Sequence, residues 1–385
     1  MKSFLDEDAL NLNHVGPTPW GAALAQRLAG LVPAPLEVCL FANGGAEGVE
    51  AAMKLATAAT GRARFVACAN GYHGTGIGPL ALMGQARPRA PFEALLPRAE
   101  IIPFGDESAL ERALAKRDAA AFVVEPIQGE GGVVLAPDGY LAKAKELCGR
   151  YGTLLVLDEV QTGLGRTGTM FALEHEGVVP DVLVLGKALG GGLAPISAAV
   201  TTKALQEKAY GTTEAFDLHG STFGGNAFAC AAALETLDIV RDEKLAERSA
   251  RLGARLLGRL REGLAGHPLV KEVRGRGLLV AVELGATDRS WLSRQAPQLV
   301  DAVSQRLLGQ WICLEMLEKG YLLQPAALRW EVLRLEPPLT IEETELDAAT
   351  DALIETLRDH EGLARLALRS GARLAAQAIS RGSFR

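Results

Sequence analysis

The chain has 385 residues, of which 48% are hydrophobic, and a net charge of −6. It is long enough for one large domain and a smaller one. It lacks both the basic excess of a nucleic-acid-binding protein and the run of about 18 apolar residues that a membrane span needs. Its first residues, MKSFLDEDALNLNH, contain no apolar signal-peptide core. We therefore expect no nucleic-acid partner, no membrane partner and no secretory signal.

Cysteines and histidines are few and scattered. The chain has five cysteines with no CxxC pair, and six histidines with no spacing typical of metal ligands. Metal sites and disulfide frameworks both need clustered residues. We therefore expect no bound metal, and we interpret the cysteines as small core residues of a protein in the reducing cytoplasm.

Apolar runs of strand length alternate with helical patterns over residues 36–235. The runs are RFVACA, AEIIPF, AAFVVEP, TLLVLDEV and DVLVLGKA. Continuous apolar runs indicate strands buried on both faces, and the helical patterns between them indicate an α/β domain with a mostly parallel sheet. Clear helical patterns cover 46–60 and 137–151. Ligands bind such sheets beyond the carboxyl ends of the strands, so we expect Asp158 and Lys187, which lie at two such ends, to face one crevice.

The pattern changes after residue 235. One long helix is expected over about 226–264, followed by a strand pair in VKEVRGRGLLVAVEL, more helix and a final strand in EVLRLEPP. These elements predict a smaller α+β domain. The predicted parts are a short N-terminal segment (1–20), a large α/β domain (21–235), a smaller α+β domain (236–360) and a helical tail (361–385).

One glycine-rich segment, GLGRTG at residues 163–168, matches the dinucleotide-binding pattern GxGxxG. A dinucleotide site needs these glycines directly at a strand-to-helix turn, with an acidic residue about 20 positions further on. Here residues 158–162 intervene after the strand, and no clear helix follows. We therefore favour a glycine-rich loop over a nicotinamide or flavin site.

A second glycine-rich segment, NGGAEGVEAAMK at residues 43–54, opens a strongly helical stretch that ends at Gly61. The backbone N–H groups of Gly45 and Ala46 would point out of the helix N-terminus, which favours a bound phosphate. Taken alone, the segment is equally typical of a helix entry without a ligand.

Lys187, in VLGKALGGG, places a lysine at the end of a strand that we expect to be buried. An unpaired buried charge is costly, and a lysine amine can instead condense with an aldehyde. Pyridoxal phosphate has an aldehyde for Lys187, a phosphate for the helix N-terminus, and a ring nitrogen that a negative Asp158 would keep protonated. Tyr72, in GYHG, supplies an aromatic face for the ring. Each residue alone also has a structural explanation, as a helix cap, a surface lysine or a core aromatic.

Motifs in the same order across nearly the whole chain resemble those of the class III (ω-amino acid) aminotransferases, which are pyridoxal-phosphate enzymes of fold type I. The segments PFEALLP and IIPFGD look most like putrescine and related diamine aminotransferases. The resemblance implies a seven-stranded, mostly parallel sheet in the large domain, a smaller α+β domain, and pyridoxal phosphate as cofactor. The most specific motifs are LDEVQTGLGRTG and LGKALGGG, and the others include NGGAEGVEAAMK, GYHG, VEPIQGEGGV, STFGGN and LRLEPPL.

The resemblance also assigns roles to individual residues. Lys187 would be the Schiff-base lysine and the proton carrier, and Asp158 the partner of the ring nitrogen. Arg334 would bind a substrate carboxylate, and Glu130 would neutralise Arg334 when the substrate lacks that group. The remaining cofactor contacts would be Gly45, Ala46, Tyr72, His73, Gln161 at the ring hydroxyl and Thr222 from a second subunit. Such a shared site implies a homodimer.

The reaction that the resemblance implies moves an amino group in a ping-pong manner through a pyridoxamine form. The donor would be a terminal amine (a diamine or an ω-amino acid) or glutamate, and the acceptor an oxo acid or aldehyde. Thr75 follows YHG where relatives often have a basic residue, which favours a diamine or an apolar aldehyde. Two alternatives stay open: another pyridoxal-phosphate enzyme on this scaffold (an aminomutase, racemase or decarboxylase), or an inactive cofactor-binding scaffold. The second arises because the N-terminal region is shorter than in family members, as expected of a truncated chain, a piece of a larger synthase or a naturally short protein.

Overall fold

The structure is a computed structural model that describes residues 2–6, 11, 18–285 and 307–360. The chain divides into two compact units: a large unit of Met1–Gly129 and Leu135–Arg248, and a small unit of Glu130–Val134 and Ser249–Arg385. The expected boundary between residues 235 and 236 falls inside the helix Ala227–Asp242 of the large unit, and that unit continues to Arg248. The expected helical tail, 361–385, lies outside the described residues.

A seven-stranded sheet forms the centre of the large unit, with the strand order β1-β9-β8-β7-β4-β2-β3. The pairs from β8 to β3 are parallel, whereas β9 runs antiparallel to both of its neighbours. The predicted mostly parallel, seven-stranded sheet is therefore confirmed. Its strands are β1 (Val38–Ala42), β2 (Arg64–Cys68), β3 (Ala99–Ile102), β4 (Ala119–Val124), β7 (Leu154–Asp158), β8 (Val182–Leu185) and β9 (Ser197–Thr201).

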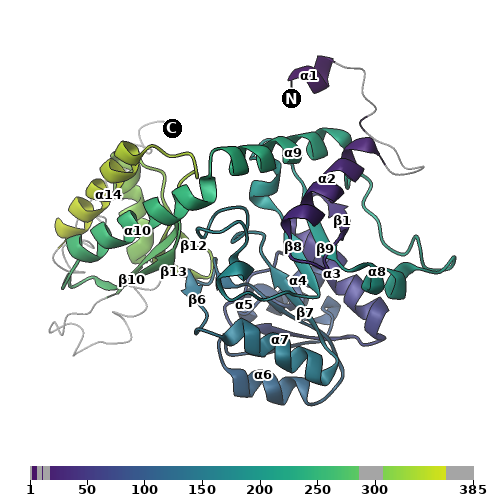
Figure 1. Cartoon of the computed structure of the whole chain (residues 1–385). Coiled ribbons are helices and arrows are strands. Elements are labelled where there is room, and N and C mark those ends of the chain that lie inside the picture. The colour runs from purple at the N-terminus through teal and green to yellow at the C-terminus, as the bar shows by residue number, and fades with distance from the viewer. Residues whose placement is uncertain (1, 7–10, 12–17, 286–306, 361–385) are drawn as a thin grey trace, which may run out of the picture. The chain divides into compact units, whose positions relative to one another are not determined.

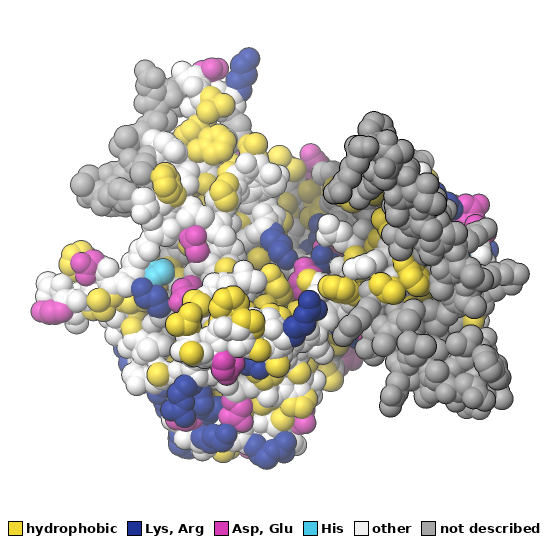
Figure 2. Space-filling model, turned by 180° about the vertical axis from the view of Figure 1, so that it is seen from behind, with side chains coloured by type: hydrophobic (Ala, Val, Ile, Leu, Met, Phe, Trp, Pro, Cys, Tyr) yellow, Lys and Arg dark blue, Asp and Glu magenta, His cyan; other side chains and the backbone are white. Residues whose placement is uncertain are grey.

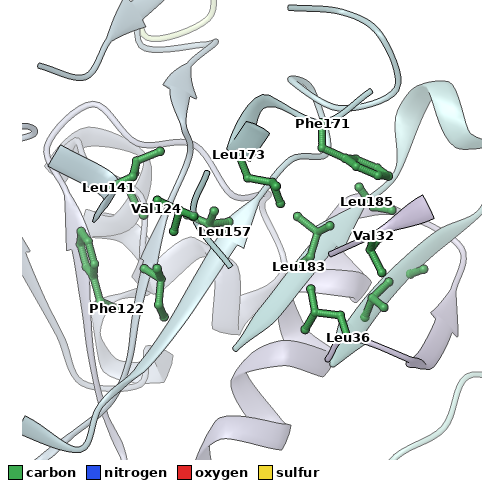
Figure 3. Close-up of a cluster of buried hydrophobic side chains, with 14 of the residues drawn as sticks. Val32, Leu36, Phe122, Val124, Leu141, Leu157, Phe171, Leu173, Leu183 and Leu185 are labelled. Carbon is green, nitrogen blue, oxygen red and sulfur yellow. The ribbon is translucent and has the colours of Figure 1, made fainter. Parts of the chain in front are cut away.

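Both faces of this sheet are buried, which explains the continuous apolar runs. Successive side chains of a strand point to opposite faces. Phe122 and Val124 of β4 therefore pack in one cluster with Leu157, while Val123 packs in the cluster on the other side of the sheet. Figure 3 shows the first cluster, in which side chains of β4, β7 and β8 meet leucine and phenylalanine side chains from neighbouring segments.

Helices surround the sheet of the large unit (Figure 1). The expected helix 46–60 is confirmed as α3, whereas the expected helix 137–151 begins only after Gly139, which lies in the left-handed region at φ 81°. The helices are α1 (Lys2–Asp6), α2 (Pro19–Leu31), α3 (Gly45–Thr60), α4 (Ile77–Ala81), α5 (Ala86–Arg89), α6 (Glu107–Leu114), α7 (Tyr140–Tyr151), α8 (Lys203–Tyr210) and α9 (Ala227–Asp242), with 3-10 turns η1 (Ala90–Leu95), η2 (Ala172–His175) and η3 (Lys187–Gly190). Two short strands, β5 (Ile127–Gln128) and β6 (Val134–Leu135), pair beyond β4.

The small unit is built on a four-stranded antiparallel sheet with the order β10-β11-β13-β12. The predicted strand pair and final strand are confirmed as β10, β11 and β13, and their leucines and valines share a core with the helices of the unit. The strands are β10 (Val270–Arg276), β11 (Leu279–Leu284), β12 (Gln324–Ala326) and β13 (Arg329–Leu335), and the helices α10 (Leu245–Gly263), α13 (Gly309–Glu318) and α14 (Glu343–Arg358).

The single helix expected over 226–264 was wrong, because the structure has two helices there, α9 and α10. Lys244, between them, lies in the left-handed region at φ 50°. An L-residue in that conformation interrupts the helical hydrogen-bond ladder. The break falls on glutamate and lysine, which are good helix formers, so propensity alone does not reveal it.

Candidate active site

A pocket of about 230 Å³ in the large unit collects most of the residues singled out in the sequence. It lies beyond the carboxyl ends of β2, β4, β7 and β8, where parallel sheets bind ligands. Asp158 is the last residue of β7 and Lys187 follows β8 after one glycine, so both face this pocket as expected. The lining residues are Gly45, Ala46, Tyr72, His73, Gly74, Thr75, Glu125, Asp158, Val160, Gln161 and Lys187.

Lys187 differs from expectation in its exposure. All residues of β8 are buried, but the chain turns at Gly186, and Lys187 itself is exposed. Its backbone lies in the left-handed region at φ 41°, which is uncommon for a residue with a side chain and is often associated with functional sites. Its ammonium group forms no ion pair with a described residue, so the amine is available to a ligand in the pocket.

The N-terminus of α3 forms another wall of the pocket. No side chain caps this helix at Gly44, so the first N–H groups, at Gly45 and Ala46, stay available for an anion. A Cβ atom at Gly45 would lie 2.7 Å from Cγ1 of Val160, which also lines the pocket. The helix end can therefore approach Val160 closely only because residue 45 has no side chain.

Asp158 and His73 form a buried pair in the pocket. Nδ1 of His73 lies 2.7 Å from Oδ2 of Asp158, and the Val160 N–H donates to Oδ1 of Asp158 at 3.1 Å. Burial lowers the pKa of His73, but the hydrogen bond and the charge of Asp158, with that of Glu125, outweigh burial and raise the pKa overall. Nε2 of His73 is buried without a hydrogen-bond partner among the described residues.

Glu125 is a pocket residue that the sequence reasoning missed. It directly follows β4, and its carboxylate accepts the N–H groups of Tyr72 at 2.9 Å and Gly129 at 3.0 Å. Burial and the charge of Asp158 raise the pKa of Glu125 to about 7, against the opposing effects of His73 and of these two hydrogen bonds. The signal that found Asp158, an acidic residue at the end of a buried strand, was also present at Glu125 in AAFVVEP.

Arg334 and Glu130 lie in the small unit, where they form an ion pair. Arg334 belongs to β13, and its Nη1 donates to Oε1 of Glu130. The Ala327 N–H donates to Oε2 of Glu130 at 2.9 Å, so both carboxylate oxygens are bound. Both side chains are largely buried, which makes the guanidinium a strong candidate to bind another carboxylate if Glu130 releases it.

Thr222 does not line the pocket. It is exposed on the segment that precedes α9, a position that leaves its predicted role in a second subunit untested. The GLGRTG segment is a series of turns that opens no α-helix, and the 3-10 turn η2 begins only at Ala172, so the expected glycine-rich loop is what the structure contains.

The pocket residues fit pyridoxal phosphate chemically. The donor set comprises a free amine at Lys187, a carboxylate at Asp158 for a protonated ring nitrogen, and uncapped N–H groups at the α3 N-terminus for a phosphate. Two further features suit a ligand. A side chain at residue 45 would fill the space beside Val160, and Nε2 of His73 has no hydrogen-bond partner among the described residues. Across the described ranges, no helix is long and apolar enough to cross a membrane, and no three His, Cys, Asp or Glu residues gather as metal ligands would.

Comparison with known proteins agrees with this interpretation of the pocket. The sequence model of the family described as aminotransferase class-III matches residues 10–357. Aminotransferase PigE of Serratia sp. (strain ATCC 39006) is 37% identical over 383 residues, a match that covers 91% of this chain and 45% of PigE. The chain therefore spans less than half the length of this curated relative.

Solved structures give the same result. Ornithine aminotransferase from Toxoplasma gondii ME49 is 36% identical, with a TM-score of 0.81 over 91% of this chain and 80% of that protein. A transaminase from the marine bacterium Virgibacillus is 26% identical, with a TM-score of 0.83 over 94% and 84% of the two chains. One structure of the Toxoplasma gondii enzyme has partial occupancy of pyridoxal phosphate at its active site.

Proposed function

The chain belongs to the class III aminotransferases, and from that premise we propose that it transfers amino groups with pyridoxal phosphate as cofactor. The observation that carries the proposal is one pocket with three chemical functions: the Lys187 amine, the Asp158 carboxylate and the uncapped N-terminus of α3. A lone glycine-rich helix entry or a lone lysine has an ordinary structural explanation. All three in one pocket match the aldehyde, ring nitrogen and phosphate of a single cofactor.

When bound, pyridoxal phosphate supplies an electron-withdrawing ring that stabilises negative charge on the substrate carbon bearing the amino group. Asp158 would keep the ring nitrogen protonated, and His73 would hold the Asp158 carboxylate in place. Lys187 would hold the cofactor through its amine, and Nζ of Lys187 would serve as the proton carrier. Tyr72 would supply an aromatic face for the ring, Gln161 a partner for the ring hydroxyl, and the Gly45 and Ala46 N–H groups donors for the phosphate.

For the substrates, we propose a terminal amine, from a diamine such as putrescine or an ω-amino acid, together with glutamate and its oxo acid or an aldehyde. Arg334 supports this choice because it can bind a carboxylate bidentately, while its ion pair with Glu130 keeps it neutralised when the substrate has none. Thr75, a neutral residue at the pocket, favours an amine or aldehyde without a second carboxylate. Two of the related solved structures are described as ornithine and acetylornithine aminotransferases, whose named substrates also carry a side-chain amine.

We further propose a homodimer in which Thr222 reaches the cofactor phosphate of the partner subunit. The segment between α8 and α9 supports this, because Phe216, Leu218 and Phe223 are 71%, 57% and 56% exposed there. Figure 2 shows hydrophobic side chains on the arm that this segment forms beside α8 in Figure 1. A second copy of the chain would cover these apolar side chains. Cytoplasmic localisation stays a prediction from the cysteine pattern.

The test is a half-reaction. The protein is loaded with pyridoxal phosphate and mixed with putrescine, or separately with glutamate, without an acceptor. We expect the visible absorption band of the bound cofactor to be replaced by that of pyridoxamine phosphate, with stoichiometric release of the carbonyl product. Lys187→Ala should abolish the response, whereas Lys203→Ala, an exposed lysine of α8, should behave like the wild type.

Two outcomes would contradict the proposal. A cofactor band that ignores every amine would indicate a binding scaffold without transferase activity. A reaction that returns the cofactor unaminated would indicate an aminomutase, racemase or decarboxylase, and release of carbon dioxide would identify the last of these.

A further inference from the structure

Glu125 occupies an unusual position for a carboxylate. Glu125 is only 5% exposed and lines the pocket, and no described lysine or arginine forms an ion pair with it. Burying a carboxylate without a counter-charge is costly unless hydrogen bonds compensate. Glu125 meets that cost with one backbone N–H on each oxygen, from Tyr72 on Oε1 and from Gly129 on Oε2.

These two N–H groups belong to two different segments, one that lines the pocket and one that packs behind a pocket residue. Tyr72 lies on the loop that also carries His73 and Gly74, all of which line the pocket. Gly129 packs against Gln161, since a Cβ at residue 129 would lie 2.3 Å from Oε1 of Gln161. A single carboxylate therefore connects the loop that carries Tyr72 to the turn that packs against the Gln161 carboxamide.

Glu125 also acts on its neighbours through charge. The titratable groups that interact with it are His73 on the loop after β2, Asp158 at the end of β7 and the buried thiol of Cys68 in β2. Lys187 lines the same pocket. The negative charges of Asp158 and Glu125 both raise the pKa of His73, in opposition to burial, so the imidazolium is stabilised from two sides.

We propose that Glu125 is a positioning residue of this pocket: its two oxygens hold the loop of Tyr72 and His73 and the Gly129 turn in place, and its carboxylate supports the buried pair of His73 and Asp158 from a second side. The ring-facing groups are then set before a ligand arrives, which is the condition for tight binding of a planar cofactor. The part of this proposal that concerns the cofactor rests on the proposed function. The part that concerns His73 does not.

Glu159 provides a matched control, because it is a buried glutamate that plays a purely structural part. It is 1% exposed, adjoins Asp158 in the sequence, and accepts the N–H groups of Ala172 at 2.6 Å and Leu173 at 2.7 Å. Burial raises the pKa of Glu159 to about 7, as it does for Glu125. Glu159 does not line the pocket, so a general effect of removing a buried carboxylate should be equal in the two variants.

The experiment measures two quantities in the full chain for wild type, E125Q, E125D and E159Q. The first is the pH midpoint of the His73 imidazole in cofactor-free protein, from NMR of isotope-labelled histidine with H73N used to assign the signal. E125Q should lower the midpoint by about one pH unit, E125D should keep it near the wild-type value because the charge remains, and E159Q should leave it unchanged. The second is the dissociation constant of pyridoxal phosphate, which E125Q and E125D should raise about tenfold through a lost backbone anchor, and E159Q by less than about twofold.

A His73 midpoint that moves no more in E125Q than in E159Q would overturn the charge part of the proposal. Equal affinities for the cofactor in these two variants would overturn the anchoring part. If E125Q does not fold, E125D against E159Q still decides the anchoring, and the His73 midpoint is measured in E125A, which also removes the charge. A wild-type protein that binds no pyridoxal phosphate would overturn the proposed function instead, while the NMR midpoints would continue to test Glu125.

Discussion

The pocket of the large unit and the sheet of the small unit use buried charge in opposite ways. In the large unit no described lysine or arginine pairs with Glu125, Asp158 or Glu159, and burial raises the pKa of both glutamates to about 7. In the small unit the buried charges neutralise one another. Burial would raise the pKa of Glu283, but hydrogen bonds from Arg274 at 2.6 Å and Arg329 at 2.8 Å outweigh it, and the pKa is lowered.

The contrast separates charge that completes the fold from charge that serves a ligand. A matched buried pair is already stabilised by the protein, so it has little affinity left for a further group. Unmatched charges with shifted pKa values gather where a cofactor or substrate supplies the missing partner. Arg334 with Glu130 is the exception in the small unit, because this matched pair would, in the proposed function, open so that Arg334 binds a substrate carboxylate instead.

The largest expected effect comes from removing the charge of Asp158, which His73 contacts but which no described lysine or arginine neutralises. Asp158→Asn keeps the shape of the side chain and an oxygen for His73 but loses the negative charge that keeps the ring nitrogen protonated. We expect amino transfer to fall by about 10²- to 10³-fold, measured as the rate of the first half-reaction in stopped flow.

Asp181→Asn is the control for that substitution. Asp181 directly precedes β8, at the end of the strand opposite the pocket. There it accepts the Leu155 N–H at 2.7 Å and pairs with Lys145 at 2.7 Å. Its variant should lose stability but keep the rate per folded molecule. Equal rate losses in the two variants would mean that Asp158 acts only through the fold.

A smaller and more selective effect is expected from the small unit. Arg334→Gln removes the guanidinium but leaves the chemistry of the pocket in place. KM for glutamate and 2-oxoglutarate should rise by about tenfold to hundredfold, the range for one charge-assisted interaction, while the half-reaction with putrescine changes little. Arg329→Gln, on the same strand but paired with Glu283, should leave both KM values unchanged. A parallel loss for putrescine and glutamate would remove the distinction between the two units.

A substitution at Gly45, at the N-terminus of α3, should give a smaller effect still. Gly45→Ala places a methyl group about 2.7 Å from Val160, so the helix end or Val160 must shift, and the affinity for pyridoxal phosphate should fall about tenfold. Gly30→Ala in α2 meets nothing within 4 Å and should stabilise the chain by about 0.5–1 kcal/mol without changing that affinity. An unchanged cofactor titration for Gly45→Ala would show that the phosphate binds elsewhere.

Strand periodicity predicted much of the fold and the main pocket, because the signals are local. Five continuous apolar runs became parallel strands, and acidic or basic residues at the ends of two of them pointed to a shared crevice. The strands at the β1 edge were not predicted, since SAAVT of β9 consists of small residues with little hydrophobic contrast. The antiparallel direction of β9 also depends on the tight turn after Lys187, where Gly191 and Gly192 take positive φ values.

Other features depend on contacts between distant segments, which sequence patterns do not contain. The exposure of Lys187 follows from a left-handed residue after a buried strand, and the break between α9 and α10 follows from another at Lys244. Glu125 has the same strand-end signal as Asp158, but its two partners, the N–H groups of Tyr72 and Gly129, could not be predicted because only the fold brings them together.

The smallest expected effect concerns stability and its dependence on pH. The pKa of Glu159 rises on folding from 4.5 to about 7, chiefly through burial, so the folded state binds the proton more tightly than the unfolded state. The stability from this group is therefore complete below about pH 4.5 and is lost as pH rises through about 7. Glu283 has the opposite sign: its pKa is lowered, so its contribution is present at neutral pH and is lost on acidification. Glu159→Gln should flatten the decline of the unfolding free energy between pH 4.5 and 7, and Glu283→Gln should flatten the loss in acid, both measured by urea titration at a series of pH values. If both substitutions changed the pH profile in the same direction, the expected difference between a buried carboxylate without a basic partner and one with such a partner would be wrong.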